Sequence, residues 1–211
     1  MESLVLSLHR LDQRATLALN ALSGSGSDPL WQLFSDIQVW IPLYLLCAAI
    51  LLRRLGWKRA LIVLGTALAA FGTCDQLSNL VKDSVARLRP CYSAEMALGG
   101  LDLLEDPGGY YGFFSAHAAN AFSLALCLVE GLRLDKSRNY LIFNIMITLW
   151  ASLVSLSRVF VGKHCLGDLL AGAAIGALLG YALSLLARRL FGRNPRPDSS
   201  GAGNPSPQAQ G

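Results

Sequence analysis

Charged residues are scarce in this sequence, and that scarcity excludes most soluble folds. Only 15% of the 211 residues are Asp, Glu, Lys or Arg, whereas 53% are hydrophobic, and the mean hydropathy is +0.43. Soluble domains usually carry about 25% charged residues. A soluble protein of this composition would lack the polar surface needed to cover itself. We therefore expect an integral membrane protein, and the length permits one domain or two small ones.

Cysteine is also sparse. Five cysteines are too few for a disulfide-dense scaffold, and the high apolar content excludes a collagen-like or disordered chain. A targeting peptide is not expected, because the first residues provide no basic segment. The formal net charge of +4 is more informative about membrane topology than about binding to nucleic acid.

Hydrophobic periodicity predicts an all-α, polytopic membrane bundle of five to six helices that span the membrane or lie on it. Residues 4–22 carry apolar residues at spacings of three and four, which predicts an amphipathic helix at the membrane interface. A Ser- and Gly-rich break follows at 23–29. Five later segments are each near the ~20 residues that a bilayer requires. They are 30–53, 59–81, 115–133, 139–157 and 165–187.

These segments divide the chain into three regions. Residues 1–27 form the amphipathic helix and its linker, and residues 28–191 form the transmembrane domain. Residues 192–211 are rich in Pro, Gly, Ser and Gln and are expected to be a disordered cytoplasmic tail. Small residues at 171–180 predict close helix packing in the last span. Asp75 predicts a hydrogen bond between helices, with a polar contact near a pocket as the alternative.

Most basic residues lie at one end of the expected spans. Eleven of the 18 Lys and Arg residues connect the first span to the second or the third to the fourth, or follow the fifth. The positive-inside rule makes that side cytoplasmic. The connections at 82–114 and 157–165 then share the opposite face, where the remaining basic residues need another explanation. The eleven are Arg53, Arg54, Lys58, Arg59, Arg133, Lys136, Arg138, Arg188, Arg189, Arg193 and Arg196.

Three polar clusters lie on that opposite face and contain two of the three histidines. Arg offers a planar donor fork to phosphate oxygens and Lys a point charge, while the free N–H groups at a helix start favour an anion. His164 and Asp168 are four residues apart, so the carboxylate can orient the imidazole. The clusters predict a phosphate pocket with a histidine nucleophile and a second histidine for proton transfer. They are 82–90, with Lys82 and Arg89; 114–117, with Ser115 and His117; and 157–168, with Arg158, His164 and Asp168.

In order and spacing, K-x6-R-P, S-x-H and S-R-x5-H-x3-D resemble the motifs of the type 2 phosphatidic acid phosphatase (PAP2) family, over about residues 30–187. The resemblance implies that 28–191 is a PAP2-like catalytic domain. It implies that His164 attacks phosphorus, that Asp168 holds its ring, and that His117 protonates the leaving oxygen and later activates water. No metal and no other cofactor is implied. The implied phosphate ligands are Lys82, Arg89, Ser115, Arg158 and the backbone N–H of Ala116.

The middle motif departs from the usual P-S-G-H. Phe114 replaces Pro and Ala116 replaces Gly. Ala keeps its N–H, and its ordinary backbone conformations suit a helix start. Phe114 could face lipid or gate the site. These departures leave the chemistry standing but weaken any inference about the substrate.

Five residues near the motifs receive structural interpretations. Arg87 and Lys163 are expected to extend toward lipid headgroups, and His9 is expected to lie in the interface. Cys91 and Cys165 each follow a motif on the same oxidising face. A disulfide between these two cysteines is therefore one hypothesis.

The sequence thus predicts a multi-pass lipid phosphatase of the bacterial inner membrane, with a periplasmic active site and a lipid phosphate as its partner. The candidate substrates are undecaprenyl diphosphate, phosphatidylglycerol phosphate, phosphatidate and a phosphate of lipid A. One alternative is a lipid phosphotransferase that uses the same phosphohistidine. Another is a non-catalytic lipid-binding membrane protein. A vanadium haloperoxidase is less expected, because those relatives are large soluble proteins.

Overall fold

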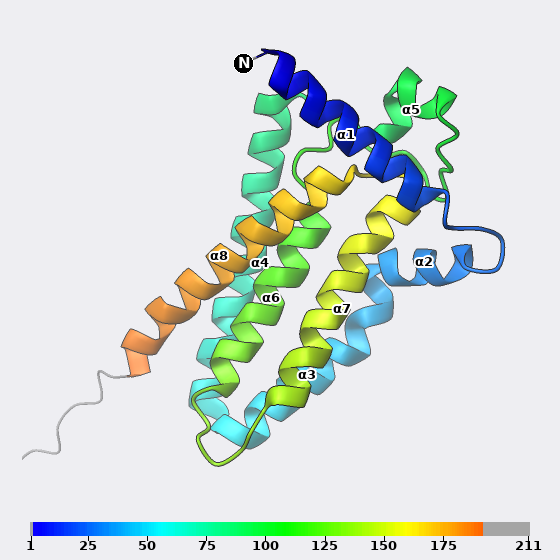
Figure 1. Cartoon of the computed structure of the whole chain (residues 1–211). Helices are drawn as coiled ribbons and strands as arrows, with labels where there is room; N and C mark the ends of the chain where they lie inside the picture. The colour runs from blue at the N-terminus through cyan, green and yellow to red at the C-terminus, as the bar shows by residue number, and fades with distance from the viewer. Residues whose placement is uncertain (1, 192–211) are drawn as a thin grey trace, which may run out of the picture.

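The computed structural model describes residues 2–191, and this part of the chain is almost entirely helical (Figure 1). The predicted all-α bundle is confirmed. The tail at 192–211 lies outside the described residues. The helices are α1 (Glu2–Asn20), α2 (Asp28–Ser35), η1 (Ile37–Trp40), α3 (Ile41–Leu55), α4 (Trp57–Val85), η2 (Pro90–Tyr92), α5 (Ala94–Leu98), α6 (Ala116–Leu132), α7 (Leu141–Phe160) and α8 (Leu166–Phe191).

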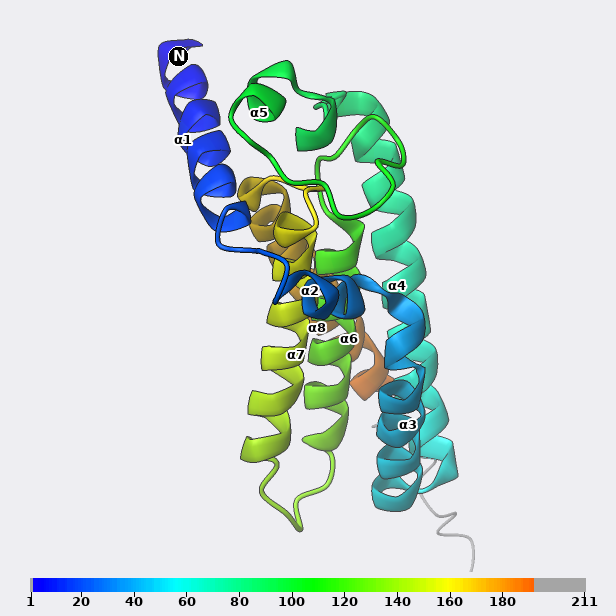
Figure 2. The ribbon, with the colours of Figure 1, turned by 90° about the vertical axis from the view of Figure 1, so that its right-hand side faces the viewer.

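The helices α3, α4, α6 and α7 run roughly along the molecule, and α8 runs obliquely to them, as Figures 1 and 2 show from two sides. Four stretches are long and apolar enough to cross a membrane: Ile37–Leu55, Trp57–Val85, Leu141–Phe160 and Leu166–Arg189. The fifth helix, α6, has 17 residues and packs against α3, α4, α7 and α8. Because α6 is surrounded by other helices, most of its side chains contact protein and few face the surroundings.

The close packing that the small residues of the last span predict is confirmed. Glycines at every fourth position of α8 lie directly against the backbone of α6. A Cβ atom on Gly176 would lie only 2.1 Å from the carbonyl oxygen of Ala119. This spacing lets the two backbones approach each other closely, as small residues allow between membrane helices. The facing pairs are Gly172 with Ser115, Gly176 with Ala119, and Gly180 with Ser123.

The prediction of one continuous span over 30–53 is wrong, because the chain turns after α2. Asp36 is extended, and its carboxylate accepts the N–H of Gln38 at 2.9 Å, which starts η1 in place of a further turn of α2. α2 instead packs against α7, where the rings of Trp31 and Phe160 stack with centroids 3.9 Å apart. The break leaves Ser35 inside the bundle.

α1 lies across the ends of α7 and α8 (Figure 1). Leu4, Leu8 and Leu11 are exposed on its outer side, whereas Thr16 and Asn20 are fully buried against the protein. The predicted helix is confirmed, and two of its polar residues, Thr16 and Asn20, are among those that contact the bundle.

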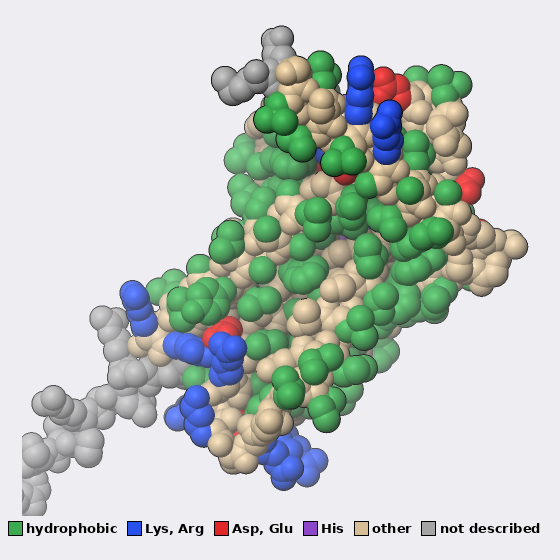
Figure 3. All heavy atoms as spheres, viewed as in Figure 1, with side chains coloured by type: hydrophobic (Ala, Val, Ile, Leu, Met, Phe, Trp, Pro, Cys, Tyr) green, Lys and Arg blue, Asp and Glu red, His purple; other side chains and the backbone are tan. Residues whose placement is uncertain are grey.

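Basic and apolar side chains separate along the molecule. Figure 3 shows most of the visible Lys and Arg side chains at the lower end and others near the upper end, with hydrophobic side chains covering the middle. Arg53 and Arg54 close α3 at this end, and Arg188 and Arg189 lie in the last turn of α8.

Candidate active site

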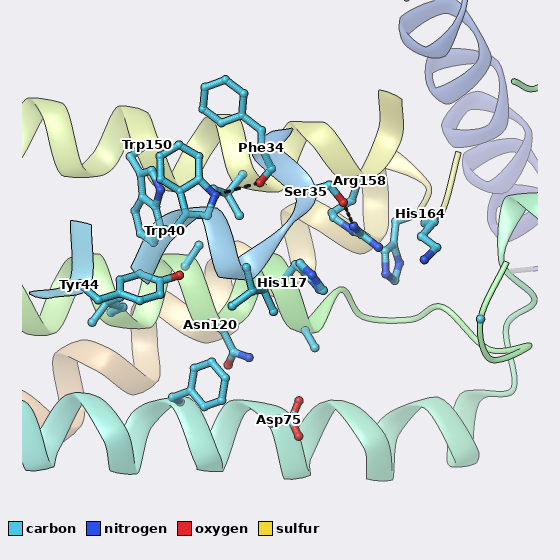
Figure 4. Close-up of a pocket in the computed structure, with 18 of the residues that line it drawn as sticks. Phe34, Ser35, Trp40, Tyr44, Asp75, His117, Asn120, Trp150, Arg158 and His164 are labelled. Atoms are coloured by element: carbon cyan, nitrogen blue, oxygen red, sulfur yellow. Dashed lines mark hydrogen bonds between the residues drawn. The ribbon is translucent and has the colours of Figure 1, made fainter. Parts of the chain in front are cut away.

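Six of the eight predicted site residues line one cavity of about 400 Å³ between the helices. Figure 4 shows this cavity, with His117 between His164 and the aromatic side chains Tyr44, Trp40 and Trp150. The other two predicted residues, Ser115 and Asp168, are fully buried, and the N–H of Ser115 donates to the carbonyl oxygen of Asp168 at 3.0 Å. The six lining residues are Lys82, Arg89, Ala116, His117, Arg158 and His164.

His164 lies in the loop between α7 and α8 and pairs with Asp168 in the first turn of α8. His164 Nδ1 is 3.4 Å from Asp168 Oδ2, and this oxygen also accepts the N–H of Cys165 at 3.0 Å. Contact with the carboxylate through Nδ1 leaves Nε2 of the imidazole free to react. Burial lowers the pKa of His164 to about 4, although Asp168 acts in the opposite direction. The ring is therefore neutral near pH 7, as a nitrogen nucleophile requires.

His117 is the second residue of α6, and the start of that helix fixes its place. Ser115 is the N-cap, and its Oγ accepts the N–H of Ala118 at 3.4 Å. Ser115 itself has no exposed surface and is not among the residues that line the cavity. Its contact with phosphate stays a prediction, and its observed contacts orient the helix that carries His117.

Arg158 lies in the last turn of α7 and is 4% exposed. Its Nη1 donates to Ser35 Oγ and, at 3.3 Å, to Glu105 Oε2, whereas its Nε has no partner in the described part of the chain. Lys163 Nζ lies 3.2 Å from the same Glu105 oxygen. Burial acts to raise the pKa of Glu105, but Ser35, Arg158 and Lys163 outweigh it and hold that pKa below its usual value. The ionised Glu105 therefore fixes Arg158 while leaving guanidinium donors for a ligand.

Lys82 approaches the same cavity from α4, and Arg89 approaches it from the segment after α4. Arg89 Nε donates to Tyr111 O at 3.2 Å and its Nη1 to Pro107 O at 3.0 Å. These bonds hold the 107–111 loop beside the cavity. Lys82 has no ion pair with any other described residue. Lysine and arginine donors that converge on two histidines are suited to a phosphoryl group.

Two basic residues that the sequence assigns to the lipid headgroups form ion pairs in the cavity or beside it instead. Arg87 donates to Asp168 Oδ1 at 2.9 Å and to Asp12 Oδ2 at 2.5 Å. Lys163 lines the cavity and pairs with Glu105. The headgroup interpretation is wrong for both, because nearby carboxylates give these side chains charged partners within the protein. The position of Arg87 inside the first motif is a signal for this role, whereas Asp12 lies far from every motif.

Two further interpretations are corrected. Asp75 lines the cavity, and no hydrogen bond joins it to another helix within residues 2–191, so the predicted helix–helix bond is wrong. Cys91 and Cys165 are free thiols, so the disulfide hypothesis is also wrong. Cys165 is buried at the start of α8, and Cys91 Sγ instead lies 4.0 Å from Pro107 O. The third histidine, His9, is exposed on α1, and its place in the membrane interface stays a prediction.

Comparison with known proteins decides the family. The model of the PAP2 superfamily matches residues 59–192. The chain belongs to the PAP2 superfamily. This PAP2 protein is 33% identical over 189 residues to a lipid A 4'-phosphatase of Bacteroides thetaiotaomicron, covering 88% of this chain and 81% of the relative. It is 29% identical over 182 residues to a lipid A 4'-phosphatase of Porphyromonas gingivalis, covering 84% of this chain and 75% of the relative.

Solved structures show the same fold. The transmembrane PAP2-type phosphatidylglycerolphosphate phosphatase from Bacillus subtilis matches with a TM-score of 0.70 at 20% identity, covering 87% of this chain and 88% of that one. Aquifex aeolicus LpxE matches with a TM-score of 0.56 at 18% identity, covering 83% and 93%. The family that the motifs predict is confirmed, and the protein is a PAP2-type phosphatase with helices long and apolar enough to span a membrane.

Proposed function

We propose that this PAP2 protein hydrolyses a phosphate monoester of a membrane lipid through a phosphohistidine on His164. The observation that carries the proposal is the cavity in which His164, backed by Asp168, faces His117 and a set of basic side chains. A neutral imidazole held by a carboxylate is a competent nucleophile. The basic groups supply the charge that stabilises a pentacoordinate phosphorus.

The mechanism needs two displacements at phosphorus. In the first, His164 Nε2 forms a bond to phosphorus as the bond to the lipid oxygen breaks, and His117 gives its proton to that oxygen. In the second, His117 takes a proton from water as the water oxygen attacks phosphorus and the N–P bond breaks. Phosphate leaves, and both histidines return to their starting states. Throughout, Lys82, Arg89 and Arg158 bind the non-bridging oxygens.

The first substrate to test is the 4'-phosphate of lipid A. Two relatives of similar length are named lipid A 4'-phosphatases, and they match most of this chain. The cavity continues past His117 among aromatic side chains and the polar Asn120 and Asp75. A cavity that mixes aromatic rings with polar groups gives room to the lipid, which leaves as the alcohol in the first step.

The proposed location is the inner membrane of a bacterium, with the cavity at the periplasmic face. Support comes from the basic side chains at the opposite end, which the positive-inside rule assigns to the cytoplasm.

The test is phosphate release by the purified protein from lipid A 4'-phosphate, phosphatidate, phosphatidylglycerol phosphate and undecaprenyl diphosphate, with and without EDTA. We expect release from the lipid A substrate to be unaffected by EDTA and to fall at least about a thousandfold in His164→Ala. The rate of phosphate release by His117→Ala should be lower by about 10²–10⁴-fold. His9→Ala is the matched control, because its ring is exposed on α1 outside the central cavity, and its rate should equal that of the unmodified protein.

A second measurement tests the intermediate. His117→Ala is incubated with substrate labelled on phosphorus and then denatured in alkaline detergent. The protein should carry label that is stable in alkali and lost in acid, and the His164→Ala/His117→Ala double variant should carry none. Full activity of His164→Ala would overturn the proposal. Transfer of label to added glycerol in preference to water would favour the phosphotransferase alternative.

A further inference from the structure

α1 presents three polar side chains, one per turn, to the loop that carries His164. Asp12, Thr16 and Asn20 are spaced by four residues and so lie on one helical face. Thr16 and Asn20 have no exposed surface, and the side chain of Asp12 is 16% exposed. An interfacial helix needs only apolar contacts to stay at a membrane. Buried polar contacts on this helix therefore call for another reason.

These side chains bind the helix ends on both sides of the 161–165 loop. At the start of α8, Asp12 Oδ1 accepts the N–H of Gly167 at 2.7 Å, and Thr16 Oγ1 accepts the N–H of Leu166 at 3.0 Å. At the end of α7, Asn20 Nδ2 donates to the carbonyl oxygens of Val159 and Phe160, both at 3.1 Å. The loop that positions His164 is thus held from outside the transmembrane bundle.

Arg87 extends this contact to the acid that holds His164. One end of its guanidinium donates to Asp168 Oδ1 at 2.9 Å and the other to Asp12 Oδ2 at 2.5 Å. Asp168 is fully buried, and a buried carboxylate is stable only when it is paired and hydrogen-bonded. Its Oδ2 contacts His164 and Cys165, so Arg87 supplies the charged partner for the second oxygen. Burial acts to lower the pKa of Arg87, but Asp168 and Asp12 outweigh it and raise that pKa, so the guanidinium stays charged.

We propose that Arg87 and Asp12 are positioning residues that hold the Asp168 carboxylate oriented toward His164. This inference rests on the proposed function only for the role of His164 as nucleophile. Neither residue lines the cavity, so neither touches the phosphoryl group. Loss of either one therefore slows the chemical step while leaving substrate binding intact. A residue that only stabilised the fold would instead lower the melting temperature with no change in kcat.

The test compares Arg87→Met with Arg87→Lys in the full chain, using the phosphate-release assay. We expect Arg87→Met to lower kcat by about 10–100-fold, with KM changed less than about twofold and with Arg87→Lys recovering part of the loss. Asp12→Asn should lower kcat less, because the amide oxygen can still accept the Gly167 N–H. Arg133→Met is the matched control, since it removes an arginine from another buried carboxylate, Glu130, at the far end of α6. Its kcat should not change.

A double-variant cycle separates positioning from folding. If Arg87 acts through Asp168, the Arg87→Met change should cost little further activity in an Asp168→Asn background. Equal loss in both backgrounds, or a loss in Arg87→Met that appears in KM alone, would overturn the inference. His164→Ala distinguishes the two proposals: if it is inactive while Arg87→Met has normal kcat, only the positioning role fails, whereas an active His164→Ala removes the proposed function.

Discussion

At the scale of single residues, the ionisation of His164 is set mainly by burial. Burial lowers its pKa to about 4 from the ordinary 6.5, against the opposing effect of Asp168. Because the folded protein disfavours the protonated ring, lowering the pH from about 8 to about 5 should leave the His164 ring neutral. We expect the His164 ring signals in ¹⁵N NMR to stay constant between about pH 5 and about pH 8 and to titrate near pH 4.

The free protein is the right sample for that measurement, because a phosphate ester has its own ionisation near pH 6. His9→Ala and His117→Ala assign the three histidines by the loss of one signal each. A His164 midpoint close to 6.5 would contradict the prediction, and it would mean that the carboxylate fully offsets the effect of burial.

The sequence predicts which residues belong to the site, but it does not predict which residues they contact. The motifs alone predict that His117, His164 and their basic neighbours share one site, and these side chains do line one cavity. Arg87 bonds to Asp12, 75 positions away, and no spacing rule links the two. Asp75 is ambiguous in the sequence, because a polar residue in a span can serve a neighbouring helix or a cavity equally well.

At the scale of helices, the contact between α6 and α8 sets the site. Gly172 lies against Ser115, so the same contact that joins the helices brings the N-cap of α6 beside Asp168. Gly176→Ala should force these backbones apart, because its Cβ would lie 2.1 Å from Ala119 O. We expect the free energy of unfolding to fall by about 1–3 kcal/mol, together with a loss of activity.

Unfolding in detergent and phosphate release measure the two effects of Gly176→Ala. Gly65→Ala on α4 provides the control, since a Cβ there meets no atom within 4 Å. The control should keep its stability and activity. Equal stability of the two variants would show that the α6–α8 contact tolerates a methyl group, contrary to this account.

Helix existence is easier to predict than helix ends. Long apolar runs predict α4, α7 and α8 within a few residues, because a bilayer demands that length. The run at 30–53 gives only a weak sign of its break. Ser35, Asp36 and Gln38 are polar, but a membrane span tolerates polar residues that face protein or water. The break depends on contacts distant in sequence, namely Trp31 with Phe160 and Ser35 with Arg158.

At the scale of the whole molecule, the distribution of charge bears on orientation. Five basic residues on the catalytic face oppose the positive-inside rule if they are counted alone. Three of them have acidic partners: Arg87 pairs with Asp12 and Asp168, and both Arg158 and Lys163 pair with Glu105. The basic residues that connect α3 to α4 are exposed, so the far end carries the topological signal.

This asymmetry predicts that the loop between α6 and α7 is cytoplasmic and that α5 is on the other side. The protein with Cys91→Ser is the background, because its other cysteines are buried. We add Leu98→Cys, whose position on α5 is 90% exposed, or Ser137→Cys, which is exposed in the α6–α7 loop. A membrane-impermeant maleimide should label Leu98→Cys in intact spheroplasts and Ser137→Cys only after lysis. The reverse pattern would place the cavity on the cytoplasmic face, contrary to the orientation that the exposed basic residues predict. The substrate would then be assigned to the cytoplasmic leaflet.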